Sequence, residues 1–179
     1  GIYFKLQSFV FMPVFGLNNG MVPIIAYNYG AGHKDRVIKT IKHSVAYGVG
    51  IMFVGLLAMH IFPAQLMRMF DAEESLIAIG APALETISLS FVFAGFCIVA
   101  GSVFQALGNG VYSMIVSVAR QMCVLLPVAK LLSLSGEVTL IWWAFPIAEL
   151  ASVLLTSYFL VRIYRKVICH IGEPVVQDA

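Results

Sequence analysis

Charged side chains are scarce in this sequence: Asp, Glu, Lys and Arg together make up 11% of its 179 residues, whereas 60% are apolar. A water-soluble domain carries about 25% charged and about 45–50% apolar residues. The composition therefore excludes a soluble domain and indicates an integral membrane protein. The formal net charge of +2 is too small to suggest nucleic acid as a partner, and we expect none.

Residue patterns for catalysis and metal binding are missing as well. The three cysteines, Cys97, Cys123 and Cys169, show no paired spacing and no metal-site spacing. No nucleophile and base occur in a catalytic pattern, and no acidic metal motif is present. We therefore predict that the protein is not an enzyme and holds no cofactor.

Long apolar stretches are what the sequence has instead. A hydrocarbon core of about 30 Å requires a helix of about 20 residues. The runs are continuous rather than alternating, which disfavours a porin-like barrel. Counting between charged residues and turn residues predicts five spans, at 7–29, 43–62, 87–107, 111–132 and 138–161. We expect an all-α, polytopic membrane domain over 1–168, followed by a disordered cytoplasmic tail over 169–179.

The distribution of basic residues predicts the orientation of these spans, because Lys and Arg collect on the cytoplasmic side. One side carries seven, after the first and fifth spans: Lys34, Arg36, Lys39, Lys42, Arg162, Arg165 and Lys166. The other carries three: Lys5, Arg68 and Lys130. The 30–42 turn and the C-terminus are then cytoplasmic, and the 71–74 turn and the N-terminus are external.

The start of the chain points to a longer protein. No cleavable signal peptide is visible, and the first residue is Gly1 rather than Met. An uncharged N-terminus on the outer side is unusual for a complete inner-membrane chain. We expect that a preceding span is missing and that this sequence is a fragment.

The first predicted span has a polar and aromatic face. A rotation of 100° per residue places Gln7, Phe11 and Asn18 within about 40° of one another, with Gly16 and Gly20 on the opposite side. The two glycines permit close approach of another helix. The polar side chains either hydrogen-bond neighbouring helices or line a cavity.

Arg120 and Glu149 are charged residues inside predicted spans, where an ionised side chain without a partner costs at least about 2.5–3.5 kcal/mol. Arg120 lies twelve residues before Leu132, and Glu149 lies twelve residues after Glu137. Each is therefore about 18 Å from the connecting turn, at equal depth on neighbouring antiparallel helices. The spacing predicts a buried ion pair, or alternatively a proton- or cation-linked role for Glu149. Neighbours on the same faces include Ser113, Ser117, Phe145, Ser152 and Thr156.

Several strings together resemble the multidrug and toxic compound extrusion (MATE) family. Met12-Pro13-Val14-Phe15-Gly16-Leu17 and Pro23-Ile24-Ile25-Ala26-Tyr27-Asn28-Tyr29-Gly30-Ala31-Gly32 are similar to the second helix of that family's C-terminal half. Phe104-Gln105-Ala106-Leu107-Gly108 resembles the end of its tenth helix, Arg120-Gln121 with Leu126-Pro127 its eleventh, and Trp142-Trp143-Ala144-Phe145-Pro146-Ile147-Ala148-Glu149 its twelfth.

The resemblance implies helices eight to twelve of a transporter built from two six-helix bundles around a central cavity, so the five spans would form most of one bundle. Such proteins export organic cations and other amphiphilic compounds in exchange for H⁺ or Na⁺, by alternating access. Gln7, Phe11, Asn18 and Gln105 are then the candidate substrate-binding residues. The expected partners are small amphiphilic or cationic molecules, membrane lipid and the missing N-terminal half, in a bacterial inner membrane.

One departure from the family and two alternatives bear on this interpretation. Some members carry an acidic cation ligand in the middle of the tenth helix, and the corresponding stretch 94–98 has none. Coupling would then depend on the missing half or on Glu149. A lipid-linked oligosaccharide flippase of the same superfamily would be expected to line its cavity with several Arg or Lys residues. An integral-membrane enzyme would need clustered carboxylates near one interface.

Overall fold

The computed structural model describes residues 1–70, 72–134 and 136–172, and this part of the chain is helical without strands. Asp71 of the predicted external turn and residues 173–179 of the predicted tail lie outside the described residues. The helices are α1 (Ile2–Gly30), α2 (Lys34–Ile61), α3 (Pro63–Arg68), α4 (Glu74–Ser88), α5 (Phe91–Ala106), α6 (Gly110–Val118), α7 (Leu126–Ser133), α8 (Val138–Ile141) and α9 (Ala144–Lys166), with the π-helical segment η1 (Ala119–Leu125) and the short η2 (Ile168–His170).

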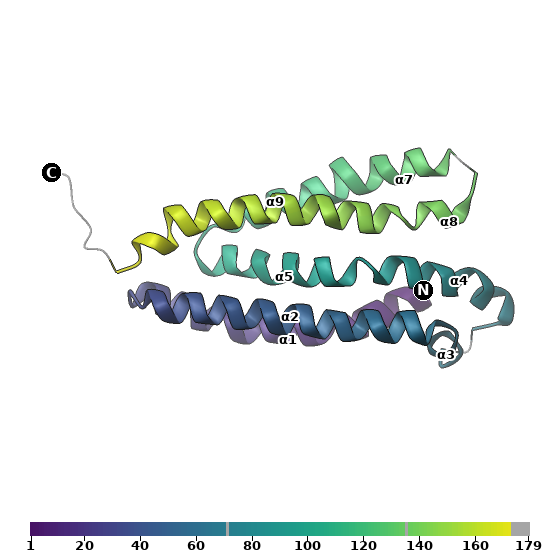
Figure 1. Ribbon diagram of the computed structural model, residues 1–179, viewed down its shortest axis with the longest axis horizontal. Coiled ribbons are helices and arrows are strands. Elements are labelled where there is room, and N and C mark those ends of the chain that lie inside the picture. Colours follow the sequence, from purple (N-terminus) through teal and green to yellow (C-terminus); the bar gives the residue numbers. More distant parts are fainter. Residues whose placement is uncertain (71, 135, 173–179) are drawn as a thin grey trace.

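The long helices lie roughly antiparallel, with α5 in the centre (Figure 1). Helices α1 and α2 pack on one side of α5, and α9 with the α6–η1–α7 segment packs on the other. Among the described residues, four helical stretches are long and apolar enough to cross a membrane, and the bent pair α4–α5 raises the number to as many as five. The turn between α1 and α2, the turn before α6 and the end of α9 gather at one end of the bundle.

The third apolar stretch is broken rather than continuous. Helices α4 and α5 meet at an angle of 50°, whereas the sequence predicts one helix over 87–107. Ser90 explains the break, because both its backbone N–H and its hydroxyl donate to the carbonyl of Ile87, at 3.0 Å and 2.6 Å. Bonds from a serine to a carbonyl three residues back compete with the regular helical ladder.

The fourth stretch contains a π-helical turn over Ala119–Leu125, directly before Pro127. Proline has no backbone N–H, and its ring clashes with the carbonyl four residues earlier. The ladder therefore shifts, and Leu126 N–H donates to the carbonyl of Gln121, five residues back. One turn of wider helix results, and Arg120 lies within it.

Two glycines make the turns at one end of the bundle. Gly32 and Gly108 have φ angles of 73° and 76°, in the left-handed region that glycine adopts at helix C-termini. The N–H of the following residue reaches back across each turn, from His33 to the Asn28 carbonyl (2.9 Å) and from Asn109 to the Phe104 carbonyl (2.7 Å).

The segment after α9 packs against the turn between α1 and α2. Lys34 Nζ donates to the Cys169 carbonyl at 2.8 Å, and Ile168 and Ile171 are buried. Residues 169–172 therefore differ from the disordered tail that the sequence predicts from Cys169 onward. The reason is a contact between segments far apart in the chain, which composition does not reveal.

Close packing in the bundle uses glycines of α2 and α5. A Cβ on Gly95 would lie 2.8 Å from Met52 Cγ and 3.1 Å from the Gly48 carbonyl oxygen. By contrast, no described atom would lie within 4 Å of a Cβ on Gly16 or Gly20. The close helix approach that the sequence suggested for Gly16 and Gly20 is absent from the described part of the chain.

Candidate functional site

Two adjoining cavities lie between α1, α5 and the α6–η1–α9 side of the bundle. The first has a volume of about 330 Å³ and the second about 400 Å³. Phe15, Ile98 and Arg120 line both cavities, so Arg120 stands at the boundary between them. Pockets for small molecules usually measure about 300–1,000 Å³, and these cavities are within that range.

Arg120 and Glu149 are in direct contact beside the second cavity. Arg120 Nη1 lies 2.6 Å from Glu149 Oε1, and the exposed fractions of the two side chains are 36% and 10%. The other carboxylate oxygen, Glu149 Oε2, is buried without a hydrogen-bond partner among the described residues. One oxygen of Glu149 therefore accepts a hydrogen bond from Arg120, and the second is buried without a described donor.

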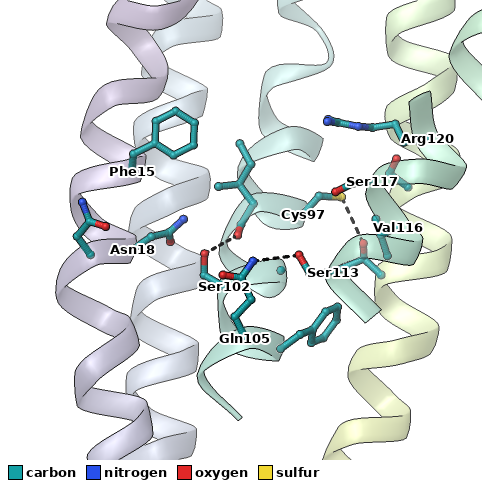
Figure 2. A pocket seen from close by; sticks show the side chains of 15 residues that line it. Phe15, Asn18, Cys97, Ser102, Gln105, Ser113, Val116, Ser117 and Arg120 are labelled. Carbon is teal, nitrogen blue, oxygen red and sulfur yellow. Dashed lines mark hydrogen bonds between the residues drawn. The ribbon is translucent and has the colours of Figure 1, made fainter. Parts of the chain in front are cut away.

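The first cavity is lined by small polar side chains from four helices. Figure 2 shows Asn18 pointing from α1 toward Ser102 and Gln105 on α5, with Ser113 and Arg120 across the space. Gln105 Nε2 donates to Ser113 Oγ at 3.2 Å, which ties α5 to α6. Asn18 is 7% exposed, and its Oδ1 has no described partner.

The second cavity combines aromatic rings with two amides. Its wall includes Gln7 of α1 and Gln121 of η1, together with Tyr3, Phe11, Phe15, Phe91 and Phe145. The Phe11 ring meets the Phe91 ring edge to face, with centroids 5.3 Å apart. Ring pairs in this edge-to-face arrangement pack stably.

The six candidate residues from the sequence are distributed over these two cavities. Asn18, Gln105 and Arg120 line the first, and Gln7, Phe11, Arg120 and Glu149 line the second. Their proposed roles in substrate binding and coupling stay predictions, because geometry alone does not assign them. The structure does place the polar face of α1 inward, toward the rest of the bundle.

Some lining residues were missed by the sequence analysis. Tyr3 precedes the predicted start of the first span, yet it lies four residues before Gln7 and therefore on the same helical face. Gln121 follows Arg120 and would face elsewhere on a regular α-helix. Both Arg120 and Gln121 lie in the wider π-helical turn, and both line the second cavity.

The described residues contain no group of three or more His, Cys, Asp or Glu side chains that could hold a metal ion. Cys97 lines the first cavity, where its Sγ accepts a hydrogen bond from Thr156 Oγ1 at 3.7 Å. The side chains that line the two cavities can offer a ligand charge, amide and aromatic contacts.

Comparisons with known proteins identify relatives of this chain. The family model described as MatE matches residues 1–131. The multidrug export protein MepA of Staphylococcus haemolyticus is 25% identical over 166 residues, covering 93% of this chain and 36% of MepA. MepA of Staphylococcus aureus is 28% identical over 150 residues, covering 83% of this chain and 33% of MepA. The chain therefore spans about a third of the length of these curated relatives.

Solved structures give the same fold. The MATE multidrug transporter DinF-BH superposes with a TM-score of 0.80 at 32% identity, covering 92% of this chain and 36% of DinF-BH. A second structure is that of a multidrug resistance MATE family transporter of the MOP superfamily in an inward-facing conformation. It superposes with a TM-score of 0.81 at 15% identity, covering 90% of this chain and 38% of that transporter. At this low identity the similarity supports the fold alone. With the family model matching well over half of its residues, the chain belongs to the MatE family, the multidrug and toxic compound extrusion family, and is a multi-pass membrane protein.

Proposed function

We propose that this chain is part of a secondary active transporter that exports amphiphilic and cationic drugs. The observation that carries the proposal is the pair of adjoining cavities on the inner side of α1, lined by amides, aromatic rings and one ion pair. The wall suits molecules that are partly apolar and partly polar. The similarity to multidrug export proteins over most of the chain supports the same class of cargo.

Transport would proceed by exchange with H⁺ or Na⁺ and by alternating access, with no cofactor besides the coupling ion. In such transporters two bundles rock around a site near the middle of the bilayer. The relatives are about three times as long as this chain, so we propose that the chain forms one bundle and works against a second. The bacterial inner membrane is the proposed location.

The polar face of α1 supplies the first test. We expect Asn18→Leu in the full-length protein to change the relative resistance of cells to different exported compounds, because the amide lines the first cavity. Asn28→Leu is the matched control: Asn28 is equally buried on the same helix, with Nδ2 bonded to the Ile24 carbonyl, and lines neither cavity.

Resistance profiles across a panel of compounds, normalised to the amount of protein in the membrane, separate the outcomes. A changed order of compounds for Asn18→Leu with an unchanged order for Asn28→Leu supports the proposed function. An equal loss for every compound, with poor membrane yield, would assign Asn18 to helix packing. Wild-type protein that confers no resistance to any compound would contradict drug export itself.

A further inference from the structure

The two charges at the boundary of the cavities are unequally exposed. The Arg120 side chain is 36% exposed and lines both cavities, whereas that of Glu149 is 10% exposed and lines only the second. Among the described residues, Arg120 is therefore the one charged side chain in the wall of the first cavity. A ligand in that cavity meets a guanidinium and no described carboxylate.

The guanidinium of Arg120 keeps donors that no described residue uses. Its Nη1 lies 2.6 Å from Glu149 Oε1, and neither Nη2 nor Nε has a hydrogen-bond partner among the described residues. Neither of these two nitrogens is buried. An arginine commonly binds a carboxylate through two parallel N–H bonds, and the edge formed by Nη2 and Nε has the geometry for them. Arg120 can therefore take a second acceptor while it holds Glu149.

Other side chains of the first cavity add uncharged donors. Asn18 Nδ2 has no described partner and, unlike Oδ1 of the same residue, is not buried. Ser117 is exposed, and its hydroxyl has no described partner either. Figure 2 shows Asn18 and Ser117 on opposite sides of the cavity, with Arg120 next to Ser117. A wall with one guanidinium and several uncharged donors suits a strong acceptor such as a carboxylate.

We propose that Arg120 binds the carboxylate of amphiphilic cargo at the first cavity, through Nη2 and Nε. Phe15 and Ile98 line both cavities beside Arg120, so the apolar part of the same molecule can lie against them. This inference rests on the proposed function, because it adds molecules with an acidic group, zwitterions among them, to the cargo. Arg120 then distinguishes an acid from its uncharged ester.

Equilibrium binding of two dyes to the purified full-length protein tests the proposal. Rhodamine 19 carries a free carboxylate, and rhodamine 6G is its ethyl ester, so the two differ only in the group assigned to Arg120. The double variant Arg120→Met with Glu149→Gln removes both charges and leaves no orphan charge in the bundle. Glu149→Gln alone keeps the guanidinium and removes the negative charge beside it. Arg68→Met with Glu74→Gln is the matched control, because this ion pair is exposed and lines neither cavity.

The measured quantity is the dissociation constant of the ester divided by that of the acid, which cancels effects common to both dyes. We expect this ratio to fall about tenfold in the double variant, as the loss of one charge-assisted contact predicts. It should rise in Glu149→Gln, where no carboxylate competes for the guanidinium, and stay at the wild-type value in the control. A wild-type ratio in the double variant overturns the proposal, whether both affinities are kept or fall together. A ratio in Glu149→Gln at or below that of wild type also overturns it, and this variant decides the question where the double variant does not fold.

The drug-export assay separates this inference from the function on which it rests. An unchanged ratio in the double variant, while the wild-type protein still confers resistance, rejects the carboxylate site at Arg120 and leaves drug export standing. Wild-type protein that binds neither dye and confers no resistance rejects drug export itself.

Discussion

The contact between Arg120 and Glu149 predicts an asymmetric loss of stability. Arg120→Met leaves the Glu149 carboxylate, 10% exposed, without its cation. Removing one partner of a buried pair costs about 3–5 kcal/mol, and we expect about 3 kcal/mol here because the Arg120 side chain is 36% exposed. Glu149→Gln leaves a guanidinium that can still reach water and loses one charged hydrogen bond, about 1.5–3 kcal/mol.

The double variant distinguishes a coupled pair from two independent residues. With both charges removed no orphan charge remains in the bundle, so the double variant should be more stable than Arg120→Met alone. The assay is the apparent melting temperature of the purified full-length protein, followed by size-exclusion chromatography. Arg68→Met and Glu74→Gln are the matched controls. Their pair is 3.0 Å long but 61% and 80% exposed, which makes it worth at most about 1 kcal/mol.

A double variant as unstable as the sum of the two single variants would refute the coupling. A different result would change the role of Glu149: if Glu149→Gln melts like the wild type but exports drugs regardless of the ion gradient, the carboxylate couples transport rather than stabilising the bundle. Ion-gradient dependence in proteoliposomes therefore accompanies the melting measurement.

The packing and the orientation of the bundle give two further predictions. Gly95→Ala should destabilise the protein by about 1–3 kcal/mol, because the new Cβ would lie 3.1 Å from the Gly48 carbonyl oxygen. Gly16→Ala is the control: its Cβ has open space, so the variant should melt like the wild type in the same assay. Equal effects of the two substitutions would contradict this account of the packing. A cysteine at the exposed Lys39 should react with an impermeant thiol reagent only after cells are opened, whereas one at the exposed Glu74 should react in intact cells; labelling at Lys39 in intact cells would reverse the orientation.

Composition and charge spacing were sufficient to predict a helical membrane protein. Continuous apolar runs leave few alternatives to helices in lipid, because every backbone N–H and C=O must be satisfied within its own segment. The exact ends of the helices were harder to predict from the sequence. Helix α2 begins at Lys34 rather than at residue 43, since a helix can extend past the apolar region into the basic stretch that precedes it.

The breaks in the helices could not be read from the residues alone. Pro127 produces a π-helical turn, while Pro13 and Pro23 lie inside α1, which remains one helix from Ile2 to Gly30. The same residue type thus gives different outcomes, because the neighbouring helices decide how the freed carbonyl groups are accommodated. In the same way, the spacing of Gly16 and Gly20 permits close packing but does not say whether a partner helix is present.

Equal depth was enough to suggest that Arg120 and Glu149 meet, but not what the second oxygen of Glu149 does. That distinction depends on the rotation of each side chain about its helix axis. The π-helical turn sets this rotation for Arg120, and it directs a single guanidinium nitrogen to Oε1 at 2.6 Å. Oε2 is then left buried without a described donor. One carboxylate can therefore join η1 to α9 through a single oxygen, which depth along the helices alone does not predict.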